Sequence, residues 1–167
     1  TTEEYNFGTN TITAAAWAAG GNMNVGRNAM TGFGATNTAA IGAGGYNGTA
    51  YVASAELYNG SSWTEVNDLN TARGYGAGAG TSTAGLFAGG HPGSGAVAIN
   101  ETWNGTSFTE ANDLNAIHSE FRGCGTSTAA TVAAGRTAPY PTITNLCEVW
   151  DGTNWTEVAN LNIAGVG

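Results

Sequence analysis

The acidic, basic and histidine side chains are the residues of this sequence that could carry acid–base chemistry: 12 Asp and Glu, four Arg and two His. Most of the acids fall into three sets of repeated positions: Glu56, Glu101 and Glu148; Glu65, Glu110 and Glu157; and Asp68 and Asp113. A catalytic carboxylate pair needs two acids in different environments at one place. A residue repeated in every unit is more naturally structural, and Glu120 is the one clearly unpaired acidic candidate inside the repeats. The sequence therefore predicts no catalytic residue.

Metal-ligating patterns are equally weak. His91 and His118 fall in different repeats, and no HExxH motif or paired-cysteine spacing accompanies them. Cys124 and Cys147 are expected on the first and third strands of one unit, which are not adjacent, so we expect free thiols. No metal and no cofactor is predicted.

An internal repeat is the main signal and defines the elements that must position any site. The block Glu56–Asn70 returns as Glu101–Asn115 and as Glu148–Asn162. A second block contains Thr36, Thr81 and Thr126 at intervals of 45 residues. A diverged earlier copy is indicated by Trp17, which lies six residues before Met23, as Trp63 does before Leu69.

Turn residues divide each repeat into four short extended segments. In the second copy they are 73–79, 83–88, 96–103 and 107–111, and Asn104-Gly105 joins the last two as a two-residue hairpin signal. The 27 Gly residues among many Ala, Thr, Ser and Asn also disfavour long helices. The predicted fold class is all-β.

Charge and hydropathy limit the partners. Charged residues make up 10% of the chain, Lys is absent and the net charge is -8, which argues against nucleic acid and anionic lipid. No apolar run approaches the roughly 20 residues that span a bilayer, so no membrane insertion is expected.

The repeat resembles the kelch repeat. The features that carry the likeness are the double glycine Gly89-Gly90 after the second segment, Glu101 and Trp103 on the third, and an aromatic residue on the fourth. Gly135 follows an alanine and precedes Arg136, so the last double glycine is missing. The resemblance implies a β-propeller of four-stranded antiparallel blades, with roughly 50 residues to a blade and typically about 4–8 blades to a ring.

The predicted organisation is one repeat domain. It comprises a partial blade at 1–23, full blades at 24–69, 70–114 and 115–161, and the start of another unit at 162–167. Three full units are too few to close a ring of the usual size, and open ends expose strand edges. We therefore expect flanking blades or self-association to complete the propeller.

Two groups of residues are candidates for ligand binding. Arg27, Arg73 and His118 occupy equivalent positions at the start of the first segment. The kelch resemblance implies a packing role there, with the repeated Glu of a neighbouring blade as the expected partner; sugar or carboxylate binding is the alternative. The connections between second and third segments vary most among the copies, and variable loops on a rigid scaffold are where recognition usually occurs. The candidates there are Tyr46, His91, Arg136 and Tyr140.

These features favour a non-catalytic binding or structural module. The first hypothesis is part of an extracellular surface or virion fibre-like protein that recognises a glycan or a protein through loops on one propeller face. The alternative is a purely structural scaffold or filament subunit that assembles through open blade edges. A carbohydrate-active or copper enzyme is a third alternative, but the copper ligands of galactose-oxidase-type propellers find no match in the sequence.

Overall fold

The computed structural model describes residues 20–139 and 141–166. Strands and their connections make up this part of the chain, and it contains no helix, as the sequence predicts. The diverged first copy around Trp17 and the candidate Tyr140 lie outside the described residues.

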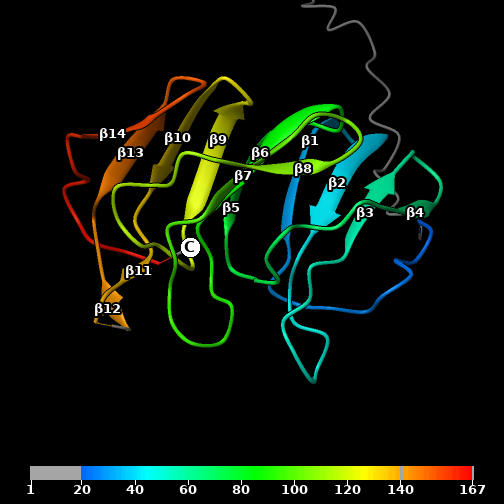
Figure 1. The fold of residues 1–167 in the computed structure, drawn as a ribbon, viewed down its shortest axis with the longest axis horizontal. Helices are drawn as coiled ribbons and strands as arrows, with labels where there is room; N and C mark the ends of the chain where they lie inside the picture. Colours follow the sequence, from blue (N-terminus) through cyan, green and yellow to red (C-terminus); the bar gives the residue numbers. More distant parts are fainter. Residues whose placement is uncertain (1–19, 140, 167) are drawn as a thin grey trace, which may run out of the picture.

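Three four-stranded antiparallel sheets follow one another along the chain (Figure 1). Sheet I has the order β1 (Thr31–Thr36), β2 (Ala39–Ala43), β3 (Ala55–Tyr58) and β4 (Trp63–Val66). Sheet II has β5 (Ala77–Thr81), β6 (Ala84–Ala88), β7 (Asn100–Trp103) and β8 (Phe108–Ala111). Sheet III has β9 (Arg122–Thr126), β10 (Ala129–Ala133), β13 (Cys147–Trp150) and β14 (Trp155–Val158). A two-stranded ribbon, β11 (Arg136–Thr137) with β12 (Thr142–Ile143), occupies the connection between β10 and β13.

The repeated residues explain the turns. The Thr81 hydroxyl accepts the N–H of Ala84 at 3.1 Å, and Thr126 accepts that of Ala129 at 3.0 Å. Between β7 and β8, Asn104 Oδ1 accepts two N–H groups and Gly105 adopts φ +92°. The predicted two-residue Asn-Gly hairpin is corrected to a four-residue connection, because Trp103 pairs with Phe108 and the Asn side chain turns residues 104–107.

The predicted first strand of the second unit begins too early. The observed strand begins at Ala77, because Tyr75 has φ +59° and breaks the extended backbone before it. The other three strands of this unit lie within the predicted segments.

The first strands of the three sheets lie side by side, and glycine permits this approach. A Cβ built on Gly78 of β5 would lie 2.9 Å from Thr31 Cγ2 and 3.1 Å from the Gly32 carbonyl oxygen. On Gly123 of β9 a Cβ would lie 3.1 Å from Ala77 Cβ. Small residues are therefore needed where these inner strands meet.

The core consists of two clusters, each shared by neighbouring sheets. Between sheets I and II lie Phe33, Ile41, Ala43, Ala55, Leu69, Phe87, Trp103 and Phe108. Between sheets II and III lie Ala77, Ala79, Leu86, Ala88, Leu114, Phe121, Ala130, Val132, Trp150 and Trp155. Sheets II and III therefore each bury their aromatic residues against the preceding sheet.

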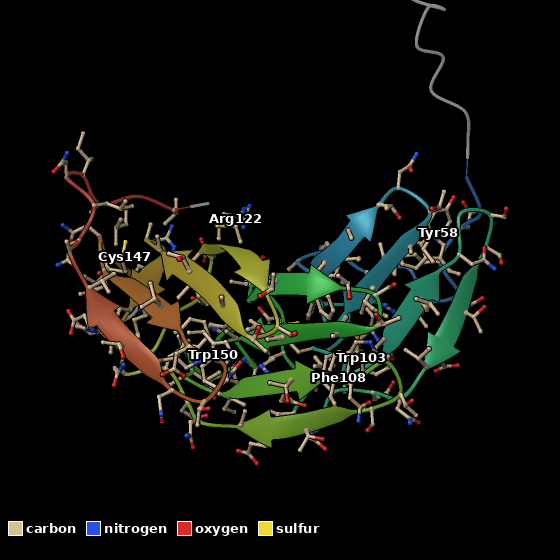
Figure 2. All side chains as sticks on the ribbon, turned by 90° about the horizontal axis from the view of Figure 1, so that it is seen from above. Tyr58, Trp103, Phe108, Arg122, Cys147 and Trp150 are labelled. Atoms are coloured by element: carbon tan, nitrogen blue, oxygen red, sulfur yellow. The ribbon has the colours of Figure 1, made fainter. Side chains whose placement is uncertain are left out.

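Viewed from above, the sheets form a fan that is open on one side (Figure 2). The described residues do not close into a ring. Trp63, in the sheet at one end of the fan, stays half-buried, whereas its counterparts Phe108 and Trp155 are 5% exposed.

The strand order of sheet III places β10 between the strands of Cys124 and Cys147, and both thiols are free as predicted.

Candidate recognition site

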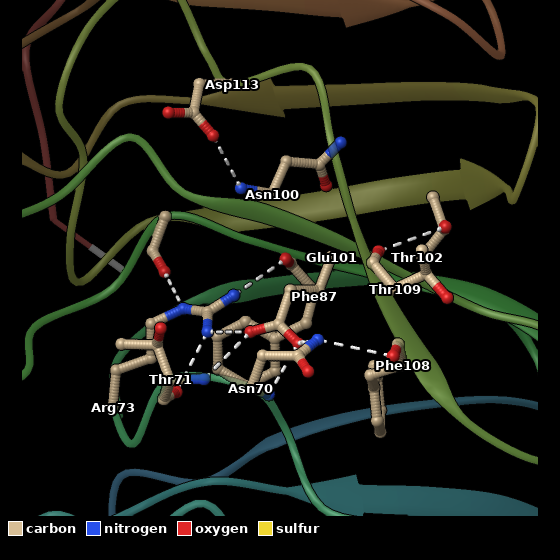
Figure 3. A network of polar contacts seen from close by, with 11 residues as sticks. Asn70, Thr71, Arg73, Phe87, Asn100, Glu101, Thr102, Phe108, Thr109 and Asp113 are labelled. Atoms are coloured by element: carbon tan, nitrogen blue, oxygen red, sulfur yellow. Dashed lines mark hydrogen bonds and ion pairs between the residues drawn. The ribbon is translucent and has the colours of Figure 1, made fainter.

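The repeated glutamates anchor the segments that lead into each sheet. Figure 3 shows the network of Glu101 in the second unit. Glu101 on β7 is completely buried and accepts the N–H and the side-chain amide of Asn70, each at 2.8 Å. The same carboxylate pairs with Nη1 of Arg73, whose Nε and Nη2 donate to the carbonyl oxygens of Gly89 and Phe87. The Arg73 guanidinium also lies 4.5 Å from the centre of the Phe87 ring. Burial lowers the pKa of Arg73, while the contact with Glu101 acts in the opposite direction.

The other two units repeat this arrangement. Glu56 receives Nη1 of Arg27 at 2.9 Å and the N–H of Asn24 at 2.7 Å. In the third unit His118 replaces arginine, with its Nε2 at 3.6 Å from Glu148 and its Nδ1 at 3.1 Å from the Ala134 carbonyl oxygen. Burial acts to raise the pKa of Glu148, but its contacts with His118 and the N–H groups of residues 115 and 116 outweigh burial and hold the pKa below its ordinary value.

Arg27, Arg73 and His118 are therefore packing residues in this structure. Their side chains are 0% exposed and each is engaged by a glutamate, so none of them is offered to a ligand. The expected partner was the glutamate of a neighbouring blade, and this is corrected to the glutamate of the same unit. The reason is that the linker turns back onto β3, β7 or β13 of the sheet it leads into.

The variable connections gather at one edge of the three sheets (Figure 1). Tyr46, His91 and Arg136 occupy equivalent places, since each forms a β-bridge with the linker just before the inner strand: to Asn28, Gly74 and Ser119 in turn. The structure thus brings three of the four loop candidates to the same edge. We call this edge the loop face; it comprises the three connections that contain Tyr46, His91 and Arg136, together with the linker residues beside them.

A row of three residues with unusual backbone conformations runs beside these bridges. Ala29, Tyr75 and Glu120 are equivalent, and all have positive φ, at +53°, +59° and +55°. They are joined in series, because the N–H of Tyr75 donates to Ala29 O at 2.8 Å and the N–H of Glu120 donates to Tyr75 O at 2.8 Å. A residue with a Cβ pays roughly 1–2 kcal/mol in this region, where glycine is favoured. The fold therefore holds Tyr75 and Glu120 in strained positions that glycine would fill more easily.

Four aromatic rings come together on the loop face. The Tyr51 ring centre lies 5.3 Å from Tyr46, 6.4 Å from Tyr75 and 5.5 Å from His91. Tyr75 remains 40% exposed and the other three rings are half-buried. Nδ1 of His91 accepts the N–H of Gly93 at 3.0 Å, which fixes the ring. We call these four residues the aromatic cluster.

The third unit carries charges where the first two carry rings. Arg136 Nε donates to Glu120 at 2.8 Å and its Nη1 donates to the Pro141 carbonyl oxygen at 2.8 Å. Glu120, the unpaired acidic candidate inside the repeats, is therefore held in an ion pair. The loop face consists of an aromatic cluster next to an ion pair, both built on repeated backbone positions with unlike side chains.

Sequence reasoning missed Tyr51 and Tyr75. Tyr75 belongs to a segment that was expected to be strand, so its side chain was not expected beside the loops. A signal was present, because Ala29, Tyr75 and Glu120 are equivalent in the repeat but chemically unlike.

Within residues 20–139 and 141–166, no three His, Cys, Asp or Glu side chains lie together as a metal site requires.

The aromatic cluster offers a surface that a ligand could contact. Exposed aromatic rings fixed on a rigid backbone offer flat apolar surfaces, and Tyr hydroxyls and the imidazole add hydrogen-bonding groups at their margins.

The chain matches no family model and no curated protein. Among the described residues, no helix could cross a membrane.

Proposed function

We propose that the chain is a non-catalytic module that binds glycans through the loop face, and that its sheets are blades of a kelch-like β-propeller. The observation that carries this proposal is the aromatic cluster, in which Tyr75 is kept exposed in a strained backbone conformation. Strain of this kind concentrates at functional sites. The C–H faces of sugars stack on aromatic rings, and a cluster of fixed rings binds them with little loss of side-chain entropy.

The propeller proposal is supported by three sheets of the same strand order, each packed against its neighbour through a repeated core. The inner strands lie side by side, as they do around a propeller axis. Further units or self-association would complete the ring. A module of this kind suits the extracellular or virion surface of a fibre-like protein, where glycans are the accessible partners.

Screening on a glycan array tests the binding function, using the wild-type chain and Tyr75→Gly. Glycine suits φ +59°, so this variant removes the exposed ring and relieves strain at the same time. The matched control is Tyr58→Ala, which removes an aromatic ring that packs against Trp63 in sheet I, away from the loop face. Binding by the wild type and the control, with its loss in Tyr75→Gly, is expected. Binding that survives in Tyr75→Gly would refute the site.

A structural scaffold is the second candidate, and the end of sheet III favours it. Leu161 is 42% exposed, whereas its counterparts Leu69 and Leu114 are 4% and 5% exposed between sheets. Ile163 beyond it is 81% exposed. Light scattering across a concentration series separates the two functions, because a discrete particle fits a binding module and indefinite growth fits a filament subunit.

A further inference from the structure

A cavity of about 240 Å³ lies where the beginnings of the three inner strands meet. Residues 30–32, 76–78 and 121–123 line it, and most of these are small or apolar. Arg122, the first residue of β9, is the charged side chain of this lining. In Figure 2 it lies on the open side of the fan, away from the packed core.

Arg122 has no acidic partner in the part of the chain that the structure describes. The other three arginines are each paired with a glutamate: Arg27 with Glu56, Arg73 with Glu101 and Arg136 with Glu120. Arg122 donates only to the carbonyl oxygen of Phe121, at 3.1 Å, and it is exposed. It is also the sole charged residue of β1, β5 and β9. In a chain of net charge -8, this cavity therefore has a local excess of positive charge.

The cavity adjoins the loop face. Its lining residues Gly76 and Phe121 directly follow Tyr75 and Glu120 in the chain. The Glu120 carboxylate lies nearest in sequence to Arg122, but it accepts from Arg136 at 2.8 Å and is engaged there. A ligand on the aromatic cluster would thus meet an uncompensated guanidinium at the edge of its site.

We propose that this cavity binds the anionic group of an acidic sugar, a carboxylate or a sulfate, and that Arg122 is its partner. The inference rests on the proposed glycan-binding function and adds the class of glycan. A guanidinium binds either group through two parallel charge-assisted hydrogen bonds, which are stronger than bonds between neutral groups. The rings of the cluster would contact the neutral face of the same sugar or of its neighbour.

The experiment compares ligands of matched size by calorimetry and by backbone amide NMR. The ligands are oligogalacturonate, sulfated oligogalactose, neutral oligogalactose and polyglutamate, together with inorganic sulfate. The proteins are the wild type, Arg122→Gln, Arg122→Lys and Tyr75→Gly. Arg122 is exposed, so its variants are expected to fold, and their urea midpoints check this.

The wild type is expected to bind at least one acidic sugar about tenfold more tightly than the neutral one, which is the effect of one charge-assisted contact. Arg122→Gln should abolish that preference, and Arg122→Lys should restore part of it. The amides of Gly78 and Gly123 should shift with the acidic ligand alone. The acidic sugar that binds more tightly identifies the group as carboxylate or sulfate.

Other outcomes overturn a defined part of the proposal. Equal affinity for acidic and neutral sugars, or a preference that survives in Arg122→Gln, refutes the anion site while leaving glycan binding intact. Sulfate-induced shifts at Gly123 that require Arg122, without binding of any sugar, support the anion site and refute the glycan function. Polyglutamate that binds as tightly as oligogalacturonate assigns the cavity to an acidic peptide and refutes the sugar.

Discussion

Replacing Glu101 by Gln tests the buried ion pair that joins each linker to its sheet. The carboxylate is 0% exposed and receives Arg73, the N–H and amide of Asn70 and, at 3.4 Å, the N–H of Thr71. Glutamine keeps the shape but removes the charge and places an NH₂ group against these donors. Arg73 is then a buried cation without its counter-ion. Breaking such a pair by removing one partner destabilises proteins by about 3–5 kcal/mol, so this loss is expected in the free energy of unfolding.

The assay is equilibrium unfolding in urea, followed by tryptophan fluorescence, with the slope checked against the wild type. Glu110→Gln is the matched control, because Glu110 lies opposite Glu101 on β8 and is exposed. Its change should stay within about 0.5 kcal/mol. The double variant Arg73→Met with Glu101→Gln should recover part of the loss, since it removes the unpaired cation. A Glu101→Gln protein as stable as Glu110→Gln would refute this account of the network.

Three further predictions concern acid stability, inner-strand packing and thiol exposure. The pKa of Glu148 is held below its ordinary value in the folded chain, so its contribution to stability is present above the pKa of the unfolded chain and is lost as the pH falls through the folded pKa. Glu148→Gln should therefore lose less stability than the wild type as the pH falls from about 6 to about 3, as measured by urea midpoints. Gly78→Ala should destabilise the fold by about 1–3 kcal/mol, because its Cβ would lie 2.9 Å from Thr31, whereas Gly26→Ala, with open space around it, should change the thermal midpoint little. Cys124 is exposed and Cys147 is buried, so a thiol reagent should label Cys124 first, and equal rates would contradict the position of β9 at the inner edge of sheet III.

The repeat made much of the fold predictable. Equivalent Thr and Asn residues mark turns because their side chains bond to the local backbone, and such signals are readable over a few residues. The pairing of Arg73 with a glutamate was predictable as chemistry, but its location within one unit depends on how the linker turns.

The recognition site was only partly predictable, because its geometry also depends on how the linkers turn. Tyr46, His91 and Arg136 were identified from variable loops, but Tyr51 and Tyr75 complete the cluster. Tyr75 reaches the loop face because its backbone is left-handed, and local propensity does not predict that conformation for tyrosine. Hydrogen bonds from the adjacent units, to Ala29 and from Glu120, hold it there. Conformations imposed by neighbouring repeats are not encoded in a short window of sequence.

Saturation-transfer NMR tests most directly whether the aromatic cluster contacts sugar. Irradiating the tyrosine ring protons of the wild-type chain in the presence of oligosaccharides should transfer saturation to the C–H protons of the bound sugar. The transfer should vanish in Tyr75→Gly, with its urea midpoint at or above that of Tyr75→Ala. Transfer of equal strength in wild type and Tyr75→Gly, or no transfer from the wild type to any oligosaccharide, would contradict the assignment of the loop face as a glycan-binding site.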